Sequence, residues 1–377
     1  MTAVACAATL AALPSSASAE SSPPRHRAFW DAALGPILSG NVYRDSTAER
    51  DTGYEARLRV GLRSRHSSRT LSQIDYDFDT TAFPHAHDEN RLDHAFAALV
   101  RHRLHSRFSM EVKTGLRLSR YPHLGTFDNA SGAGQASLKG YLDARTTLEG
   151  GVGYEKKDYP DYDLDYGGPG LFSTLTRDFG RRTFGELTAA VRRDSYTERL
   201  VTNEAASAGE GSTLRRDRDW LAGGRAVRDL TLVMRLEAGY QYGHLASNGD
   251  SLAVLPGEER LLGDYYSHRR HDLSARVRKL LRRGSSLTAG VRYRDRAYRA
   301  RLARDAEGVF RQPEQLRHDR QILVSVYWDF PVPRLGGRAA FGHFGLRLRA
   351  SYERNHSNEA LYDYRAGIVS LSFTSWH

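Results

Sequence analysis

Charged side chains recur at every second position inside otherwise apolar stretches of this sequence. Between positions 54 and 63, Arg57, Arg59 and Arg63 alternate with aliphatic and aromatic residues. Successive side chains of an extended strand point to opposite faces, so this spacing gathers the charges on one face and the apolar residues on the other. Rows of fixed charge along a water-filled passage select ions. The pattern therefore indicates ion or solute selection.

We predict that the charged face lines a polar lumen. The basic lining residues predicted are Arg57, Arg59, Lys113, Arg117, Arg235, Arg276, Arg278, Arg292, Arg294, Arg347 and Arg349. The acidic ones are Glu55, Asp75, Asp77, Asp79, Glu111, Glu149, Glu155 and Glu186. In one interpretation, the basic residues near the C-terminus face the acidic ones across the bore and create a transverse field. In the other, the charges pair between neighbouring strands and simply stabilise a polar interior.

Recognised catalytic and metal-binding patterns are absent. The sequence has no G-x-S-x-G elbow, no H-E-x-x-H, no phosphate-binding loop and no dinucleotide fingerprint. Two histidine pairs, His85 with His87 and His268 with His271, fall in or beside predicted outer loops and are interpreted as solvated. The acidic loop 158–165 imitates a calcium loop without its glycine and terminal glutamate. A loosely held cation shared with lipopolysaccharide is the alternative there, and we otherwise expect no metal, no cofactor and no enzymatic activity.

The elements that must position these charges are strands, because the alternation has a period of two. The clearest stretches are 54–63, 74–79, 108–118, 148–155, 232–242, 272–278, 287–294, 322–330 and 346–352. Fainter ones lie at 35–44, 92–104, 134–145, 170–178, 184–194 and 218–227. Together with a C-terminal strand they amount to about sixteen, an even number as in single-chain bacterial barrels. The predicted fold is all-β: a transmembrane, antiparallel, up-and-down β-barrel.

The predicted connections alternate between short and long, as the periplasmic turns and outer loops of such barrels do. Short turns fall at 105–107, 145–147, 178–182, 227–230 and 281–285, and long loops at 79–91, 119–132, 156–168, 195–216, 243–270 and 296–319. The connection 331–343 is long where a short turn is expected. The loop 243–270 among them is unusually apolar, with Leu245, Leu252, Val254, Leu255, Leu261 and Leu262. We expect this loop either to fold into the bore as a constriction or to pack with its neighbours outside.

A soluble β-sandwich also has alternating strands and is the main alternative fold. Aromatic residues near the ends of the strands favour the barrel, because membrane barrels carry aromatic girdles at both interfaces. They are Tyr54, Tyr154, Tyr240, Tyr242, Tyr293, Trp328, Phe330, Tyr352 and Trp376. The strongly charged opposite face also suits a water-filled lumen better than an ordinary protein surface.

Mean hydropathy does not detect a membrane barrel of this kind. The chain has 377 residues, of which 27% are charged, a mean hydropathy of −0.57 and a pI near 9.7. No apolar run reaches the ~20 residues of a membrane helix, but alternation keeps the mean of a barrel polar. The net charge of +10 does not indicate a nucleic-acid partner, since the arginines are spread through strands rather than clustered.

The N-terminus predicts export. Residues 1–19 lack charge, contain an apolar run and end in Ala17-Ser18-Ala19, which is typical of a cleaved signal peptide. A short leader, 20–34, would follow, and the barrel would occupy 35–377. Cys6, the only cysteine, lies in the signal peptide. A mature chain without disulfides is compatible with an outer-membrane barrel.

The C-terminal strand resembles the closing strand of bacterial outer-membrane β-barrels. Val369, Leu371 and Phe373 share one face of it, and Phe373 is followed by four further residues where the family usually ends in an aromatic residue. The segment 357–365 resembles the last loop of porin-like barrels, including those of surface-lipoprotein assembly modifiers. The resemblance implies an outer-membrane location among lipid and lipopolysaccharide. It also implies recognition of the last strand by the barrel-assembly machinery.

Two functions are consistent with these features. The first is a porin-like channel for small solutes or ions. The second is a secretion barrel, for example for exopolysaccharide, fed by a periplasmic partner, with Tyr141 and Tyr327 as lumen aromatics on which sugars slide. A barrel enzyme or adhesin has less support, because no nucleophile–base pair is visible.

Overall fold

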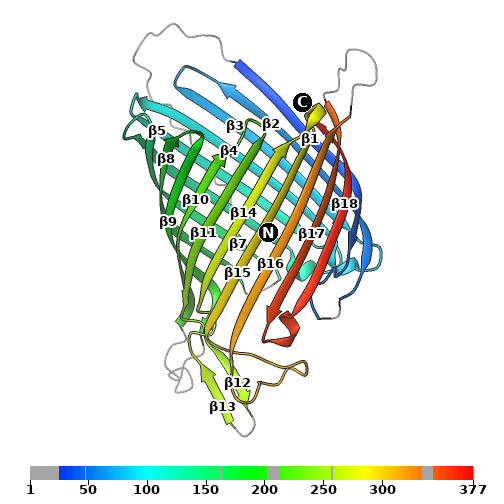
Figure 1. The fold of residues 1–377 in the computed structure, drawn as a ribbon. Coiled ribbons are helices and arrows are strands. Elements are labelled where there is room, and N and C mark those ends of the chain that lie inside the picture. The colour runs from blue at the N-terminus through cyan, green and yellow to red at the C-terminus, as the bar shows by residue number, and fades with distance from the viewer. Residues whose placement is uncertain are drawn as a thin grey trace.

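The chain forms a closed wall of sixteen antiparallel strands in the computed structural model, which describes residues 25–46, 48–161, 164–201, 213–255, 258–332 and 343–376 (Figure 1). The wall strands are β1 (Arg25–Ser39), β2 (Asp51–Arg65), β3 (Thr70–Ala82), β4 (Arg91–His105), β5 (Phe108–Arg120), β6 (Asn129–Tyr141), β7 (Thr146–Asp158), β8 (Tyr166–Gly180), β9 (Thr183–Val201), β10 (Thr213–Asp229), β11 (Met234–Ser247), β14 (His268–Leu280), β15 (Ser286–Leu302), β16 (Leu316–Pro331), β17 (His343–Ser357) and β18 (Tyr364–Trp376). Each strand pairs with its neighbours in chain order, and β1 pairs with β18. The predicted up-and-down barrel is confirmed.

Alternation along each strand separates two faces of this wall. On β2, Leu58 and Leu62 are exposed on the outside. On β18, Phe373 is 67% exposed whereas Ser372, on the opposite face, is 3% exposed. The outward face is therefore apolar and the inward face polar, which is the reverse of a soluble protein and the arrangement of a membrane barrel.

The first strand begins earlier than predicted. Residues 25–34, assigned to a leader, form the first two thirds of β1, and residues 40–44, assigned to the first strand, lie in the connection after it. The sequence signal is weak there because Ala, Gly and Pro interrupt the alternation. The β1–β18 ladder skips Gly35 and Pro36. At Gly35 a β-carbon would lie 1.8 Å from the Leu371 carbonyl oxygen, so only glycine fits this close approach.

Short turns gather at one end of the barrel and long connections at the other. The turns 66–69, 106–107, 142–145, 181–182, 230–233 and 281–285 lie at the end that holds both termini of the wall. The longer connections, among them 83–90, 121–128, 303–315 and 358–363, lie at the opposite end, called here the outer end. At the short-turn end, β16 and β17 are joined by more residues than the other strand pairs, as the sequence indicated, and most of that segment lies outside the described residues. No helix in the described ranges is long and apolar enough to cross a membrane.

Buried ion pairs stabilise the outer end. The Arg317 guanidinium, 4% exposed, contacts Asp319 at 2.9 Å and Glu359 at 3.2 Å. The Ser357 hydroxyl donates to Asp319 at 2.7 Å, and the Tyr362 ring centroid lies 3.5 Å from the guanidinium carbon. Such a site holds β16, β17 and the last loop together through charge-assisted hydrogen bonds.

The same arrangement occurs on β10 and β11. Arg215 contacts Asp217 at 2.7 Å, the Ser247 hydroxyl donates to Asp217, and the Tyr266 ring centroid lies 3.8 Å from the guanidinium carbon. In both copies the asparagine after the serine, Asn248 or Asn358, accepts a backbone N–H from the facing strand. We call these two sites the outer clasps. Neither was predicted from the sequence.

Candidate functional site

The inner wall is the candidate site. The register places every predicted lining residue, basic and acidic, on its inward positions. Their role as the lining of a pore stays a prediction.

Most of these charges pair with a neighbouring strand. Arg57 contacts Asp79 at 3.1 Å and Arg59 contacts Asp75 at 3.5 Å, both from β2 to β3. Glu111 is held between Arg101 on β4 and Lys113 on its own strand. These contacts favour mutual pairing over a field that spans the whole bore. In addition, only β2, β1 and β18 separate the acidic residues of β3 from β17 around the closed wall.

The C-terminal wall shows the same local pairing, but there the arginines outnumber the carboxylate that they contact. Asp272 is shared by three guanidinium groups, with Arg270 at 3.2 Å, Arg292 at 3.1 Å and Arg294 at 2.7 Å. Arg347 contacts Asp329 at 2.6 Å. One carboxylate facing three arginines leaves positive charge on this side.

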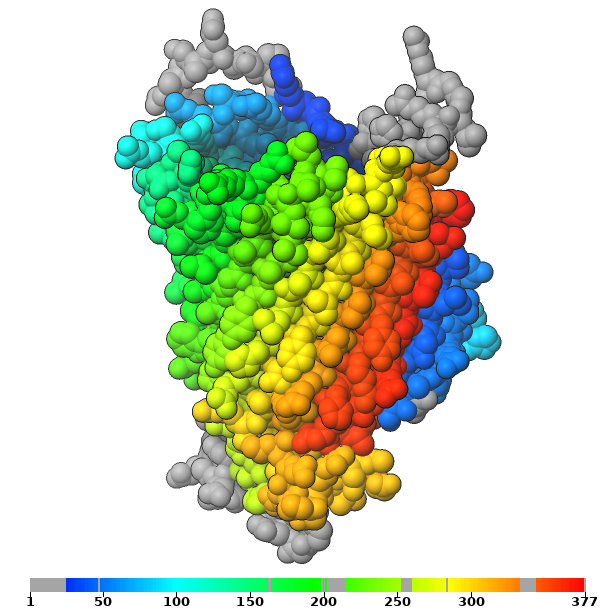
Figure 2. Space-filling model, in the orientation of Figure 1, coloured from blue at the N-terminus to red at the C-terminus, as the bar shows by residue number. Residues whose placement is uncertain are grey.

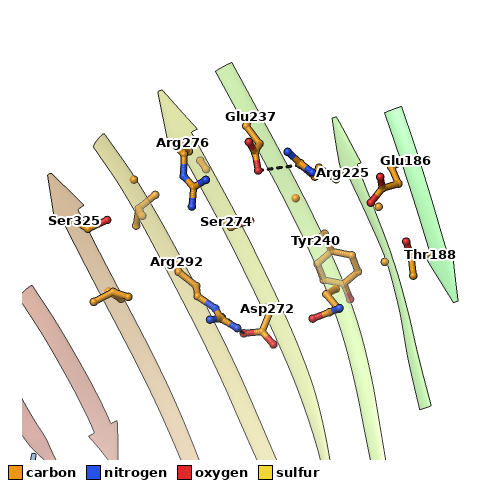
Figure 3. Close-up of a pocket in the computed structure, with 18 of the residues that line it drawn as sticks. Glu186, Thr188, Arg225, Glu237, Tyr240, Asp272, Ser274, Arg276, Arg292 and Ser325 are labelled. Carbon is orange, nitrogen blue, oxygen red and sulfur yellow. Dashed lines mark hydrogen bonds and ion pairs between the residues drawn. The ribbon is translucent and has the colours of Figure 1, made fainter. Parts of the chain in front are cut away.

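Cavities lie along the described part of the inner wall. The β9–β16 cavity, of about 490 Å³, is lined by Glu186, Arg225, Glu237, Asp272, Arg276 and Arg292 among others (Figure 3). The Arg44 cavity, of about 260 Å³, is lined by Arg44, Arg292, Arg294, Gln321, Arg349, Ser351 and Glu353 among others. The β1–β5 cavity, of about 540 Å³, is lined by Phe29, Asp31, Arg57, Arg59, Asp77, Asp79, Asp93, Arg117 and Arg347 among others.

The charge balance differs between these cavities. The β9–β16 and Arg44 cavities together hold six arginines and four carboxylates. The β1–β5 cavity holds four of each. The excess of positive charge therefore lies on the C-terminal wall, where the basic residues were predicted. The excess is smaller than the number of arginines suggests, because carboxylates line the same cavities.

The connection 40–50 between β1 and β2 folds inward. Val42 packs with Ile37, Phe83 and Ala86 in a buried apolar cluster, against which Ile368 also packs. Ile37 and Ile368 occupy inward positions, because their strand neighbours Leu38 and Val369 are exposed on the outer face. The cluster thus lies inside the wall and narrows the outer end of the bore.

Arg44 extends this connection toward the C-terminal wall. Its Nε lies 3.8 Å from Oε2 of Glu353 on β17, and it lines one cavity with Arg292 and Arg349. Glu353 also accepts hydrogen bonds from Gln321, at 2.7 Å, and from the Tyr364 hydroxyl. Arg44 and the arginines of β15 and β17 therefore face a common space.

A neighbouring loop supports the infolded segment. The Asp51 carboxylate accepts the backbone N–H groups of His85 and Ala86, at 3.0 and 2.8 Å, which fixes the loop 83–90 beside it. Burial raises the pKa of Glu89 in this loop, and the charges of Arg44 and Arg91 oppose that rise.

The predicted loop 243–270 is not the constriction. It contains the hairpin β12 (Ser251–Leu255) and β13 (Glu258–Leu262), which projects beyond the outer end (Figure 1). Arg260 contacts Glu314 at 2.6 Å, and Leu262 packs against Leu302 and Phe310. Leu262 thus packs with a neighbouring segment outside the bore, as in the second interpretation. The side chains at Leu252, Val254 and Leu255 lie outside the described residues.

Removal of residues 43–48 should raise single-channel conductance severalfold, because it deletes Arg44 and the inward turn. The Val42 N–H already donates to the Glu49 carbonyl at 2.9 Å, so the ends can be joined without moving the strands. Planar-bilayer recording is the measurement. Deletion of 251–262 is the matched control and should leave conductance unchanged. The reverse pattern, with the hairpin deletion alone raising conductance, would contradict this assignment of the constriction.

The histidine pairs and the acidic loop have other contacts. His85 contacts Asp51, the rings of His87 and His123 are 5.1 Å apart, and the His271 ring is hydrogen-bonded to the Tyr240 hydroxyl. In the loop 158–165, Asp165 accepts the Tyr159 N–H, and Asp163 lies outside the described residues. Among the described residues no group of three or more candidate ligands converges.

Sequence reasoning missed the carboxylates within the basic wall. Asp272, Asp329 and Glu237 share the inward parity of the arginines that they contact. The signal was therefore present in the alternation itself. It was lost because residues of one sign were grouped before their cross-strand neighbours were considered.

No protein-family model and no curated protein matches the sequence. Solved structures similar to the chain include CdiB from Acinetobacter baumannii, at a TM-score of 0.50 and 9% identity over 92% of this chain. The chain spans 60% of that protein's length. Outer-membrane-expressed OmpT of Vibrio cholerae gives 0.49 and 10% identity, covering 95% and 99% of the two chains. OprD from Pseudomonas aeruginosa gives 0.46 and 8%, covering 96% and 95%.

At such low sequence identities, the similarity to these structures shows the fold alone. The closed sixteen-strand wall, its apolar outer face and the likeness to CdiB agree on one architecture. The chain has the fold of the bacterial outer-membrane β-barrels.

Proposed function

We propose that the protein is an integral outer-membrane β-barrel whose bore is a polar, porin-like channel for small solutes or ions. The observation that carries the proposal is the set of charge-lined cavities along the inner face of a closed wall whose outer face is apolar. An apolar outer band suits hydrocarbon, and a charged lumen suits water and ions. Export through a cleaved signal peptide and recognition of β18 by the barrel-assembly machinery belong to this proposal. The expected lack of enzymatic activity stays a prediction.

The channel should prefer anions. Arg44, Arg292, Arg294 and Arg349 border one cavity with a single carboxylate, Glu353. A solute that passes between the infolded connection and β15–β17 meets guanidinium groups, which pair with carboxylates and phosphates through parallel N–H donors. Small anions are therefore the solute class that this site supports.

Small solutes fit the structure better than a polymer. The connection 40–50 brings Arg44 against the inner face of the C-terminal wall, and with the apolar cluster around Val42 it narrows the bore at the outer end. Tyr327 lines the β9–β16 cavity, but Tyr141 lies at the last position of β6, at the short-turn end. A continuous track of lumen aromatics for a sugar chain is thus not formed by these two residues.

Reconstitution in planar bilayers tests the proposal. We expect stepwise conductance and, in a salt gradient, a reversal potential that indicates anion preference. A heat-modifiable gel band, with different migration before and after boiling, reports the folded barrel independently. A folded barrel without conductance would overturn the channel. Cation preference would overturn the assigned solute class while leaving the channel in place.

A further inference from the structure

Arginine doublets occur on three strands of the wall at the outer end. They are Arg192-Arg193 on β9, Arg215-Arg216 on β10 and Arg269-Arg270 on β14. Because strand neighbours point to opposite faces, each doublet sends one guanidinium inward and one outward. The inward members all contact carboxylates: Arg192 with Asp194, Arg215 with Asp217, and Arg270 with Asp272.

The outward members have a different environment. Arg193, Arg216 and Arg269 are exposed, as is Arg218, the next outward residue of β10. No ion pair joins any of these four to a carboxylate in the described ranges, whereas outward Arg320 on β16 has Asp295 at 3.6 Å. Arg193 lies directly opposite Arg218 in the β9–β10 ladder. Like charges in that position repel, and no carboxylate among the described residues forms an ion pair with either of them.

These side chains form one surface. The strands β9, β10, β11 and β14 are consecutive in the wall and lie side by side on the face seen in Figure 2. His244 on β11 faces Trp220 on one side and Arg269 on the other. We call Arg193, Arg216, Arg218, Trp220, His244 and Arg269 the outward basic patch.

The position of the outward basic patch along the barrel axis indicates which part of the membrane surrounds it. Going toward the short-turn end, the next outward residue after Arg193 is Val191, and the next after Arg218 is Trp220, which is 52% exposed. Tryptophan is typical of the boundary between hydrocarbon and headgroups. The arginines thus lie where the apolar outer band ends, at the end with the long connections.

We propose that the outward basic patch binds the phosphate groups of lipopolysaccharide in the outer leaflet. Guanidinium groups at headgroup depth bind lipid phosphates through charge-assisted, often bidentate, hydrogen bonds. Two phosphates on one glycolipid would bridge Arg193, Arg218 and Arg269 and remove the repulsion between the first two. The inference rests on the proposed membrane location but not on channel activity.

The test compares two triple variants of the full chain, refolded in detergent and titrated with purified lipopolysaccharide. In the first, Arg193, Arg218 and Arg269 are each replaced by Gln. The second is the matched control, with Arg177, Arg228 and Lys279, which occupy outward positions at the short-turn end, each replaced by Gln. We expect the first to bind about a hundredfold more weakly than wild type, given the contribution of each basic side chain at a lipid surface. The control should bind within about twofold.

Two further ligands distinguish the source of the phosphate. Enzymatically dephosphorylated lipopolysaccharide should bind wild type as weakly as intact lipopolysaccharide binds the first variant. Inorganic phosphate at equal concentration should not compete. Equal loss in both variants, undiminished binding of the dephosphorylated glycolipid, or full competition by inorganic phosphate would each overturn the proposal. Heat-modifiable migration and conductance of the variants are recorded in parallel, so a failure of the barrel or of the channel is recognised separately.

Discussion

Replacing Asp319 with alanine is expected to lower the free energy of unfolding by about 3–5 kcal/mol, since it removes one partner of a buried ion pair. Asp319 is 9% exposed and contacts the Arg317 guanidinium at 2.9 Å. It also accepts the Ser357 hydroxyl. Without it, the carboxylate that Arg317 still contacts is Glu359, which Arg301 already contacts at 3.1 Å. The clasp would lose its bond between β16 and β17, and the outer end should open first.

Denaturant unfolding in lipid vesicles, followed by tryptophan fluorescence, measures this loss. The matched control is Asp79→Ala, because the Arg57–Asp79 pair has a similar distance, 3.1 Å, but side chains 55% and 40% exposed. Exposed pairs contribute about 0–1 kcal/mol. Equal destabilisation by the two substitutions would show that burial at the outer end does not strengthen the clasp.

Replacing Arg292, Arg294 and Arg349 together with glutamine should convert anion preference into cation preference. Six arginines and four carboxylates line the β9–β16 and Arg44 cavities, and the triple variant leaves the carboxylates in excess. A unit charge ~5–10 Å from an ion in water shifts its energy by about 0.4–0.8 kcal/mol. Allowing for screening, we expect the anion-to-cation permeability ratio to fall by about tenfold.

Reversal potentials across a salt gradient report this ratio. The conservative variant, with lysine at the same three positions, keeps the charge and should keep the preference. Arg347→Gln should have a smaller effect, because Arg347 lines the balanced β1–β5 cavity and is paired with Asp329. An unchanged ratio in the glutamine variant would refute the charge excess as the basis of selectivity.

The wall could be predicted from the sequence because each strand carries its own signal. The adjacent residues Leu58 and Arg59 face opposite sides of the wall, so the sequence alternates between apolar and charged residues with a period of two. The pairing of β18 with β1 followed from the need of a barrel to leave no edge. The fold was therefore available from local patterns repeated along the chain.

The constriction could not be predicted, because it depends on contacts between distant segments. Val42 folds inward since Ile37, Phe83 and Ile368 form an apolar surface there, and no periodicity in a short connection signals this. The apolar composition of the loop 243–270 suggested that this loop could be the constriction, but its Leu262 packs against Phe310 outside the bore. The outer clasps were missed for the same reason, since Asp319 contacts Ser357, and Arg317 contacts Glu359, only after the strands are aligned.

The seam between β1 and β18 has a consequence for how the molecule is made. Across it, the Ser372 hydroxyl donates to Glu55, 317 positions away in the chain. Pairing over such a separation is slow, and an unclosed sheet offers its free backbone groups to any other strand nearby. The cylinder can therefore close only after β18 has been made, and until then the unpaired edges of β1 and of the last strand formed are free to pair with other strands.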